Sequence, residues 1–253
     1  MSFILITGAS SGIGEAFAEL LAAQGHALIL VARRETALHA LAERLRTTHT
    51  IEVEVIVSDL TDTGACARLE QTLLEHQWTL HGLINNAGFG DKGAFTELAL
   101  TRQLNMIQLN VMALVELTHR LLPHMHTQDS AFIINVASIA GFMAGPNMAV
   151  YYATKAFVVS FSEALTEELK AQNIHVSALC PGATQSEFAA VANLADSKLF
   201  AKVSMTSREV AEQSLAQKHK AIVVTGLRNR IMLWLMKITP RAITRKMAAS
   251  VQT

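Results

Sequence analysis

A tyrosine and a lysine four residues apart, Tyr151 and Lys155, are the pair in this sequence whose chemistry is most readily stated. On a helix this spacing puts both side chains on one face, one above the other. Because a cation beside a phenol favours the phenolate, we expect Lys155 to lower the pKa of Tyr151. A phenol placed in this way can give a proton to a carbonyl oxygen or remove one from an alcohol. Such pairs also occur by chance, so the rest of the chain must supply the reaction partner.

A glycine-rich turn near the N-terminus predicts a site for a phosphorylated ligand. The segment 7–14 reads Thr-Gly-Ala-Ser-Ser-Gly-Ile-Gly, between an apolar run and the first helical pattern. Gly8 permits a tight turn, Gly12 lets the backbone approach a pyrophosphate, and Gly14 allows close packing of helix on strand. The N–H groups at the start of the helix then face the phosphates. An ordinary glycine turn is the alternative, and the position directly after an N-terminal strand favours binding.

Apolar runs alternate with helical patterns along the whole chain. We expect strands at 3–7, 27–32, 51–57, 80–85, 131–136, 174–179 and 221–225. We expect helices at 14–24, 36–47, 98–122 and 150–172, with two others opening at 59–62 and at a capping box at 206–209. The strands are continuous apolar runs, which is typical of a parallel sheet buried between helix layers. The predicted fold class is α/β, with a doubly wound, seven-stranded parallel sheet in a single domain, 1–253.

The composition fits this fold and excludes several other classes. The chain has 253 residues, of which 51% are hydrophobic, enough to bury a sheet on both faces. Its two cysteines, Cys66 and Cys180, lack metal-ligand spacing, so we expect no metal site and reduced thiols in a cytoplasmic protein. The N-terminus has no basic region typical of a signal peptide, and no apolar run reaches the ~18 residues that span a bilayer.

Three motifs together resemble the classical short-chain dehydrogenase/reductase family. They are the glycine turn, an Asn-Asn-Ala-Gly segment at 85–88 and the Tyr151–Lys155 pair, and they follow the family's order. The resemblance covers 3–225, and the spacing of the first two glycines differs from that of the family's extended branch. It implies a Rossmann-type fold, a nicotinamide cofactor and interconversion of a carbonyl and an alcohol by hydride transfer.

The resemblance also implies a catalytic tetrad of Asn110, Ser138, Tyr151 and Lys155. Tyr151 exchanges a proton with the substrate oxygen, Ser138 hydrogen-bonds the same oxygen, and Lys155 lowers the phenol's pKa and holds the nicotinamide ribose. The backbone carbonyl of Asn110 holds a water that links Lys155 to solvent. A strand-end cap and a packing amide are the alternative roles of Ser138 and Asn110. Tyr152, three residues before Lys155, competes for the role of acid, and the family spacing selects Tyr151.

Charge at the end of the second strand predicts which cofactor is bound. In dinucleotide-binding folds an acidic residue there binds the ribose 2′-hydroxyl, whereas this chain has Arg33 and Arg34. A guanidinium can bind a 2′-phosphate through two hydrogen bonds, which favours NADP(H) over NAD(H). A solvated pair of arginines is the alternative. The residues expected to contact the cofactor are Gly8, Ser10, Ser11, Gly12, Ile13, Gly14, Arg33, Arg34, Asp59, Leu60, Asn86, Ala87, Gly88, Tyr151, Lys155, Pro181, Gly182, Thr184 and Ser186.

Several of these residues have a second role. Asp59 resembles the family's adenine-contacting acid and can also cap a helix. The resemblance implies that the 85–88 stretch holds the adenosine ribose side and steadies the central sheet, so Asn86 is expected to be partly structural. Ser186 stands where the family usually has threonine in the segment that binds the nicotinamide carboxamide, and Thr184 is an alternative source of that hydrogen bond.

Apolar side chains in the loops near the predicted site favour an apolar substrate, with 183–205 as the substrate loop. Lys92 and Lys198 are the isolated cations nearby, so no basic clamp for a carboxylate or phosphate is evident. We therefore expect a small hydrophobic ketone or aldehyde, or the corresponding alcohol; ordinary core packing is the alternative for these side chains. They are Phe89, Phe142, Met143, Met148, Phe188 and Phe200.

The C-terminal segment 226–253 is a basic amphipathic tail. No acidic residue follows Glu212, and eight lysines and arginines do, so this part carries +8 and the first 212 residues carry −8. The apolar stretch 231–236 lies among Arg228, Arg230, Lys237 and Arg241. It is too short to span a membrane, but it suits peripheral membrane contact or a cover over the active-site cleft. The alternative is a packed C-terminal helix or a subunit contact. Nucleic-acid binding is not expected, because no motif or interleaved aromatic residues accompany the charge.

Two further expectations follow from the resemblance. The apolar faces of the helices at 98–122 and 150–172 fit the family's helix-pair contact, so we expect a homodimer or homotetramer. A non-catalytic dinucleotide-binding sensor or scaffold on the same fold is the alternative function. Such proteins typically lose the tyrosine, lysine or serine, and this chain retains all three.

Overall fold

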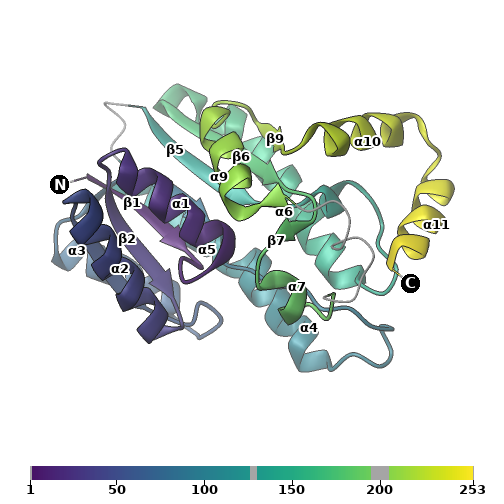
Figure 1. Cartoon of the computed structure of the whole chain (residues 1–253), viewed down its shortest axis with the longest axis horizontal. Coiled ribbons are helices and arrows are strands. Elements are labelled where there is room, and N and C mark those ends of the chain that lie inside the picture. The colour runs from purple at the N-terminus through teal and green to yellow at the C-terminus, as the bar shows by residue number, and fades with distance from the viewer. Residues whose placement is uncertain (1, 126–129, 195–204, 253) are drawn as a thin grey trace.

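Seven parallel strands form the central sheet in a computed structural model of the chain (Figure 1). The structure describes residues 2–125, 130–194 and 205–252. The strand order is β3-β2-β1-β4-β5-β6-β9, and every neighbouring pair is parallel, as predicted. The strands are β1 (Ser2–Thr7), β2 (Ala27–Ala32), β3 (Val53–Val57), β4 (Thr79–Asn85), β5 (Ala131–Val136), β6 (Ile174–Cys180) and β9 (Ile222–Val224).

Helices cover both faces of this sheet. On one face pack α1 (Gly12–Ala23), α2 (Glu35–His49) and α9 (Ser207–Ala216), and on the other α3 (Ala65–Glu75), α5 (Leu114–Leu121) and α6 (Ala149–Glu168). Successive residues of β1 point to opposite layers: Ile4 and Ile6 join the first core, and Phe3 and Leu5 join the second. This two-sided burial explains why the strands are continuous apolar runs.

The long helix predicted at 98–122 is interrupted in the structure. It consists of α4 (Leu100–Ile107), a six-residue π-helix η1 (Gln108–Ala113), α5 and a short 3₁₀ turn, η2 (Leu122–His124), that contains Pro123. Similarly, α6 ends at Glu168 and a 3₁₀ turn, η4 (Lys170–Gln172), follows it. The capping box that opens α9 at Thr206 is confirmed, because Thr206 and Glu209 exchange both expected hydrogen bonds.

The prediction that a helix opens at 59–62 is wrong. The Asp59 carboxylate instead accepts hydrogen bonds from the backbone N–H and the hydroxyl of Thr61, at 2.9 and 2.7 Å, which closes a turn. Helix α3 begins only after Gly64, whose φ of 75° lies in the left-handed region.

Shorter elements complete the description. A 3₁₀ turn, η3 (Ile139–Phe142), follows β5, and β7 (Thr184–Gln185) pairs with β8 (Met205–Thr206) in a separate two-stranded sheet. Helix α7 (Phe188–Val191) follows β7, and the tail forms α10 (Leu227–Ile238) and α11 (Arg241–Gln252), which extend from one end of the molecule (Figure 1). Among the helices described, none has the length and apolar character needed to cross a bilayer.

A buried chain of polar side chains joins the central strands to the helices behind them. Asn85 of β4 donates to Asn135 of β5 at 2.8 Å and to Thr118 of α5 at 3.0 Å. Asn135 in turn donates to Ser162 of α6 at 3.0 Å. Since buried polar groups are costly unless paired, these bonds fix the helices in register with the sheet.

Histidines gather at the amino ends of the strands, opposite the edge where the predicted site lies. His26 stacks on His81 at 5.9 Å between ring centroids, and His175 meets His219 edge-on at 4.6 Å. The pKa of His26 is lowered by burial, then by His81 and Lys218, and that of His175 is lowered by burial, then by His219 and Lys218. Lys218 therefore disfavours the charged form of both imidazoles.

We expect acid to destabilise the fold through this cluster. A histidine with a lowered pKa in the folded state takes up its proton first in the unfolded chain, so stability falls as the pH drops through about 6.5. In Lys218→Met the loss should be smaller, because one repelling cation is gone. Urea unfolding measured between neutral and mildly acidic pH checks this, with Lys220→Met as the exposed control. Parallel pH curves for wild type and Lys218→Met would contradict it.

Candidate active site

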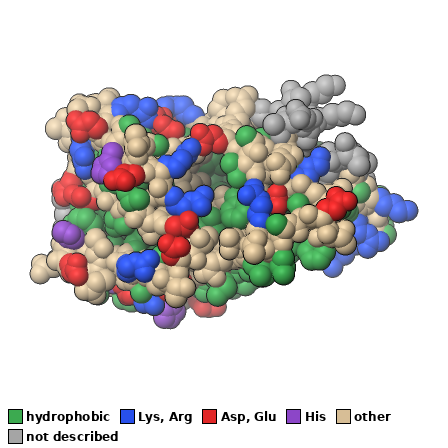
Figure 2. Space-filling view, turned by 90° about the horizontal axis from the view of Figure 1, so that it is seen from below, with side chains coloured by type: hydrophobic (Ala, Val, Ile, Leu, Met, Phe, Trp, Pro, Cys, Tyr) green, Lys and Arg blue, Asp and Glu red, His purple; other side chains and the backbone are tan. Residues whose placement is uncertain are grey.

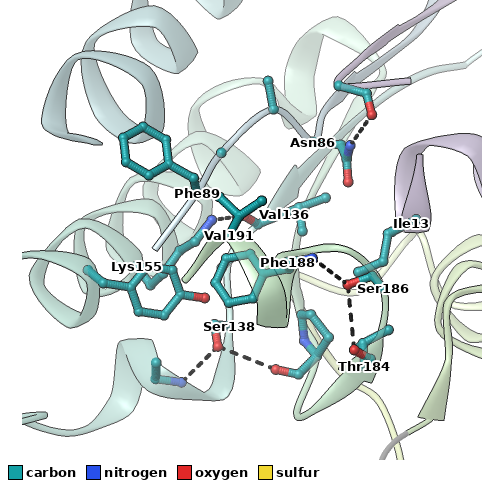
Figure 3. Close-up of a pocket in the computed structure, with 18 of the residues that line it drawn as sticks. Ile13, Asn86, Phe89, Val136, Ser138, Lys155, Thr184, Ser186, Phe188 and Val191 are labelled. Atoms are coloured by element: carbon teal, nitrogen blue, oxygen red, sulfur yellow. Dashed lines mark hydrogen bonds between the residues drawn. The ribbon is translucent and has the colours of Figure 1, made fainter. Parts of the chain in front are cut away.

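The carboxyl ends of the central strands open into a cavity of about 520 Å³. Ligand sites of open parallel sheets occur at this edge. The cavity extends from the glycine turn after β1, past Ser138 after β5 and Tyr151 and Lys155 on α6, to Met232 and Met236 on α10. Figure 3 shows Ser138, Lys155 and Phe188 converging from three separate segments. Residues far apart in the sequence are thus brought to one place.

Tyr151, Ser138 and Lys155 lie together in this cavity. Tyr151 is buried and forms a hydrogen bond with Ser138. The Ser138 hydroxyl also accepts from the N–H of Ala140 at 3.1 Å, so it caps the turn after β5 while facing the phenol. The ammonium of Lys155 donates to the carbonyl oxygen of Val136 at 2.7 Å (Figure 3). It also lies 5.9 Å from the Tyr151 ring centroid.

The expected lowering of the Tyr151 pKa by Lys155 is wrong for this arrangement. Burial raises the pKa of Tyr151 above its usual value, and the hydrogen bond with Ser138 only partly opposes this. Burial also lowers the pKa of Lys155, to about 8. Burial therefore makes the charged form of Lys155 less favourable. Its ammonium donates to a backbone carbonyl rather than to the phenol oxygen.

Tyr152 lies beside Tyr151 and also lines the cavity, but its surroundings differ. Its ring fills the space beside Gly145, where a Cβ atom on the glycine would come within 2.4 Å of it. The two tyrosine rings meet edge-on, with centroids 6.0 Å apart. The contacts with Ser138 and Lys155 are made by Tyr151.

Asn110 lies in the π-helix, outside the cavity lining. Its side chain accepts from the N–H of Phe89 at 3.1 Å and donates to the carbonyl of Phe89 at 2.9 Å and to Thr154 at 3.2 Å. Asn110 thus ties the loop after β4 to α6 and acts as a positioning residue. A π-helix adds one residue to a turn and is often found at functional sites. No pattern in the sequence predicts this π-helix.

The glycine turn fits a pyrophosphate on structural grounds. Gly8 and Gly12 have φ of 63° and 60°, which side-chain-bearing residues rarely adopt. A Cβ on Gly14 would come within 2.4 Å of the Gly8 carbonyl oxygen, so this packing requires glycine. Ser11 precedes α1 without a side-chain hydrogen bond to the first turn, which leaves those N–H groups available to an anion.

Asn86 holds this turn against β4, as expected of a partly structural residue. Its amide donates to the carbonyls of Thr7 and Gly8, at 2.9 and 3.1 Å, and its backbone N–H donates to the Thr7 hydroxyl at 3.0 Å. Figure 3 shows this side chain at the edge of the cavity.

Two arginines border the cavity at the end of β2. Arg33 forms an ion pair with Asp59 at 3.2 Å and remains two-thirds exposed. Arg34 donates to the hydroxyl and carbonyl of Ser10 and forms an ion pair with Glu187 at 2.7 Å. These arginines can bind an anionic group held near the glycine turn, and Arg34 also links that turn to the loop before α7.

Of the residues expected to contact the cofactor, all line the cavity except Gly14, which is buried beneath the turn. Leu60 forms the part of the cavity wall next to Asp59. Pro181, Gly182, Thr184 and Ser186 form the opposite wall, where the Ser186 hydroxyl accepts from the N–H of Phe188 at 3.3 Å. That contact makes Ser186 part of the turn into α7.

The predicted substrate residues are only partly brought together. Phe89, Met143, Met148 and Phe188 line the cavity, and the Phe188 ring lies 5.5 Å from that of Tyr151. Phe142 does not line the cavity, because the 3₁₀ turn after β5 directs its side chain into a core with Leu114 and Val158. Phe200 and Lys198 lie outside the described residues. Apolar residues of the wall that were not predicted include Val191, Leu194, Met232 and Met236.

A buried carboxylate anchors α7 over the cavity. Asp91 accepts from Gln103 at 3.0 Å and from Asn193 at 3.2 Å, and pairs with Arg102 at 3.2 Å. Arg102 also donates to the carbonyl of Val191 at 2.7 Å. The helix that carries Phe188 is therefore fastened to α4 by charged and polar bonds.

Comparison with known proteins identifies the family. The model of the short chain dehydrogenase family matches residues 2–197. An 11-beta-hydroxysteroid dehydrogenase-like protein, 4A of Arabidopsis thaliana, is 32% identical over 96% of this chain and 82% of its own length. A short-chain dehydrogenase of Sphingobium yanoikuyae, solved with NADPH, is 33% identical, with a TM-score of 0.82 over 96% of this chain and 98% of its own.

A third relative binds the other cofactor. A short-chain dehydrogenase/reductase of Burkholderia phymatum, solved with NAD, is 28% identical, with a TM-score of 0.81 over 92% of each chain. Sheet order, site and relatives agree: the chain belongs to the short-chain dehydrogenase/reductase family of oxidoreductases.

Proposed function

We propose that this enzyme uses NADP(H) to reduce a hydrophobic ketone or aldehyde to the alcohol, or to catalyse the reverse reaction, with Tyr151 as general acid or base. The observation that carries the proposal is one cavity in which Tyr151, Ser138 and Lys155 lie between a phosphate-binding turn and an apolar wall. NADP(H), when bound, supplies or accepts the hydride. The protein's own residues must then orient the carbonyl and move one proton.

The proton chemistry of the cavity favours carbonyl reduction near neutral pH. The raised pKa of Tyr151 keeps the phenol protonated, and therefore able to donate. Ser138 can hydrogen-bond the same substrate oxygen. With a pKa of about 8, Lys155 can hold a positive charge at neutral pH and lose it just above, so it can help return a proton to Tyr151 after turnover. Asn110 supports this path by fixing α6, and its carbonyl is the proposed seat of a linking water.

Replacing each tyrosine by phenylalanine tests the assignment of the acid. We expect Tyr151→Phe to lower kcat by about 10³-fold, since it removes the transferable proton, and Tyr152→Phe to retain most of the activity. The measurement is NADPH oxidation with a panel of apolar ketones and aldehydes. Circular dichroism and NADPH binding serve as controls for folding. Loss of turnover only in Tyr152→Phe would reassign the acid.

NADP(H) is the proposed cofactor because of the charge at the end of β2. Arg33 is exposed and lies beside Asp59, whose charge it neutralises, and no acidic residue stands at the Arg33 position itself. The NADPH-bound relative supports this choice. The NAD-bound relative shows that membership of the family does not decide it, so the argument rests on Arg33 and Arg34.

Reversing the charge at Arg33 tests the cofactor. We expect Arg33→Asp to lower kcat/KM for NADPH by about 100-fold and to change kcat/KM for NADH little, because a charge-assisted contact becomes a repulsion. The matched control is Arg68→Asp, at an arginine of α3 outside the cavity. A wild-type preference for NADH would remove this part of the proposal.

We propose an apolar substrate because apolar side chains form the cavity wall that faces Tyr151. Phe89, Met148, Phe188, Val191 and Leu194 form it, and α7 holds two of these residues in place. The hydroxysteroid dehydrogenase-like name of a relative supports a bulky apolar carbonyl, without naming one for this chain.

Loosening the anchor of α7 should weaken substrate binding selectively. In Asp91→Asn the buried ion pair with Arg102 is lost, so we expect KM for the carbonyl to rise about tenfold, with KM for NADPH nearly unchanged. Steady-state kinetics with each substrate varied in turn measure this. Glu97→Gln, at an exposed residue of the same loop, is the control. Equal increases in both KM values would mean a general loss of structure instead.

Assembly and location complete the proposal. We place a homodimer or homotetramer contact on the exposed apolar side chains of α4, η1 and α6, among them Leu104, Met112 and Phe157. The thiols of Cys66 and Cys180 are buried and unpaired, which supports the proposed cytoplasmic location.

A further inference from the structure

Helix α10 carries apolar side chains on two opposite faces. Its inner face contributes Met232 and Met236 to the cavity wall and buries Leu233. Its outer face exposes five large apolar side chains, spaced as one stripe of a helix. This outer stripe consists of Leu227, Ile231, Trp234, Leu235 and Ile238, which are 72%, 51%, 63%, 48% and 71% exposed.

Such a stripe is costly in water. Exposure of apolar surface to water is unfavourable in proportion to its area, and contiguous patches of this kind mark contact surfaces. Helix α11 also carries an exposed apolar side chain, Ile243, which is half exposed. Figure 1 shows α10 and α11 projecting from one end of the molecule, so this surface is accessible to a large, flat partner.

Basic side chains flank the outer stripe on both sides. By helical spacing, Arg228 lies on one side of it, and Arg230 and Lys237 lie on the other. All three are exposed. Helix α11 adds Arg241, Arg245 and Lys246, and Figure 2 shows Lys and Arg side chains gathered at this end of the molecule. No carboxylate follows Glu212 to neutralise them.

An apolar stripe between two basic flanks matches the surface of an anionic bilayer. The stripe can enter the boundary between headgroups and acyl chains, while the long basic side chains reach back to lipid phosphates and carboxylates. Each lysine or arginine near such a surface adds to the electrostatic attraction between protein and bilayer. A twofold contact with a second copy fits poorly, because it would oppose each basic flank with another basic flank.

We propose that α10 binds the surface of an anionic membrane through its outer stripe, so that an apolar carbonyl dissolved in the bilayer reaches the cavity past Met232 and Met236. The binding itself follows from α10 alone, whereas the delivery of substrate rests on the proposed function. One short helix would then serve as membrane contact on one side and as cavity wall on the other.

Vesicle binding tests the contact without cofactor or substrate. We expect the protein to sediment with vesicles of phosphatidylcholine and phosphatidylserine, less so at high salt, and not with phosphatidylcholine alone. The double variant Leu227→Ser/Ile238→Ser should bind at least tenfold more weakly. The matched control Leu74→Ser/Phe95→Ser changes two similarly exposed residues elsewhere, 53% and 65%, and should bind like wild type. No sedimentation at low salt, or undiminished binding by the stripe variant, overturns the proposal.

Tryptophan fluorescence reports on α10 directly. The chain has two tryptophans, so Trp78→Phe leaves Trp234 as the reporter. Its emission should shift to the blue only when anionic vesicles are added. A shift that depends on protein concentration without lipid, together with a dimer in light scattering that the stripe variant abolishes, would assign the surface to a second copy instead.

Turnover separates this proposal from the proposed function. Reduction of a water-soluble ketone needs no membrane, and the stripe variant should match wild type in that assay. With a ketone dissolved in anionic vesicles, the variant should lose at least fivefold in rate. If no ketone is turned over, the proposed reductase function is rejected, whereas the proposed membrane binding is unaffected. Turnover without vesicle binding rejects the membrane contact alone.

Discussion

The hydrogen bond from Lys155 to the carbonyl oxygen of Val136 is the contact on which the site depends. It joins the middle of α6 to the last residue of β5, and two residues further on the chain reaches Ser138. One helical turn before Lys155, the same helix presents Tyr151. The bond therefore sets the separation of the serine and the tyrosine. The buried hydrogen bonds from Asn85 to Asn135 and from Asn135 to Ser162 attach the same helix to the central strands. The residues of the site are therefore held by the central sheet.

This arrangement costs stability in return for reactivity. A lysine and a tyrosine are both buried at the cavity, and burial shifts the pKa of each towards its neutral form. A stable core would contain apolar residues here. The surrounding bonds of Asn110, Thr154 and Phe89 hold the helix in place despite this cost. Functional sites commonly depart from the rules that the rest of a sequence obeys.

Much of the architecture could be read from the sequence because burial on two faces leaves a strong local signal. The strands at 27–32 and 131–136 match their predicted bounds, since each is a run of mostly apolar residues that is buried between helix layers. The π-helix at 108–113 could not be predicted, because its cause is the fit of Asn110 against Phe89 and Thr154, which lie far away in the sequence. Phe142 was misplaced for a similar reason: a loop aromatic can face a core or a cavity, and the turn geometry decides. The contribution of the C-terminal tail to the cavity wall was one of several alternatives in the sequence analysis. The pattern of charged and apolar residues in the tail is compatible with all of them.

The wall of the cavity is rich in thioethers. Met143, Met148, Met232 and Met236 come from the loop after η3, the start of α6 and α10, and together they line much of the apolar part. Methionine side chains are unbranched and polarisable, and they change rotamer at little cost. The shape of this half of the cavity is therefore adjustable, whereas the hydroxyls of Ser138 and Tyr151 are held in place. For the proposed substrate this means that the carbonyl end would meet fixed hydroxyl groups, whereas the apolar remainder would meet side chains that can change rotamer to fit it.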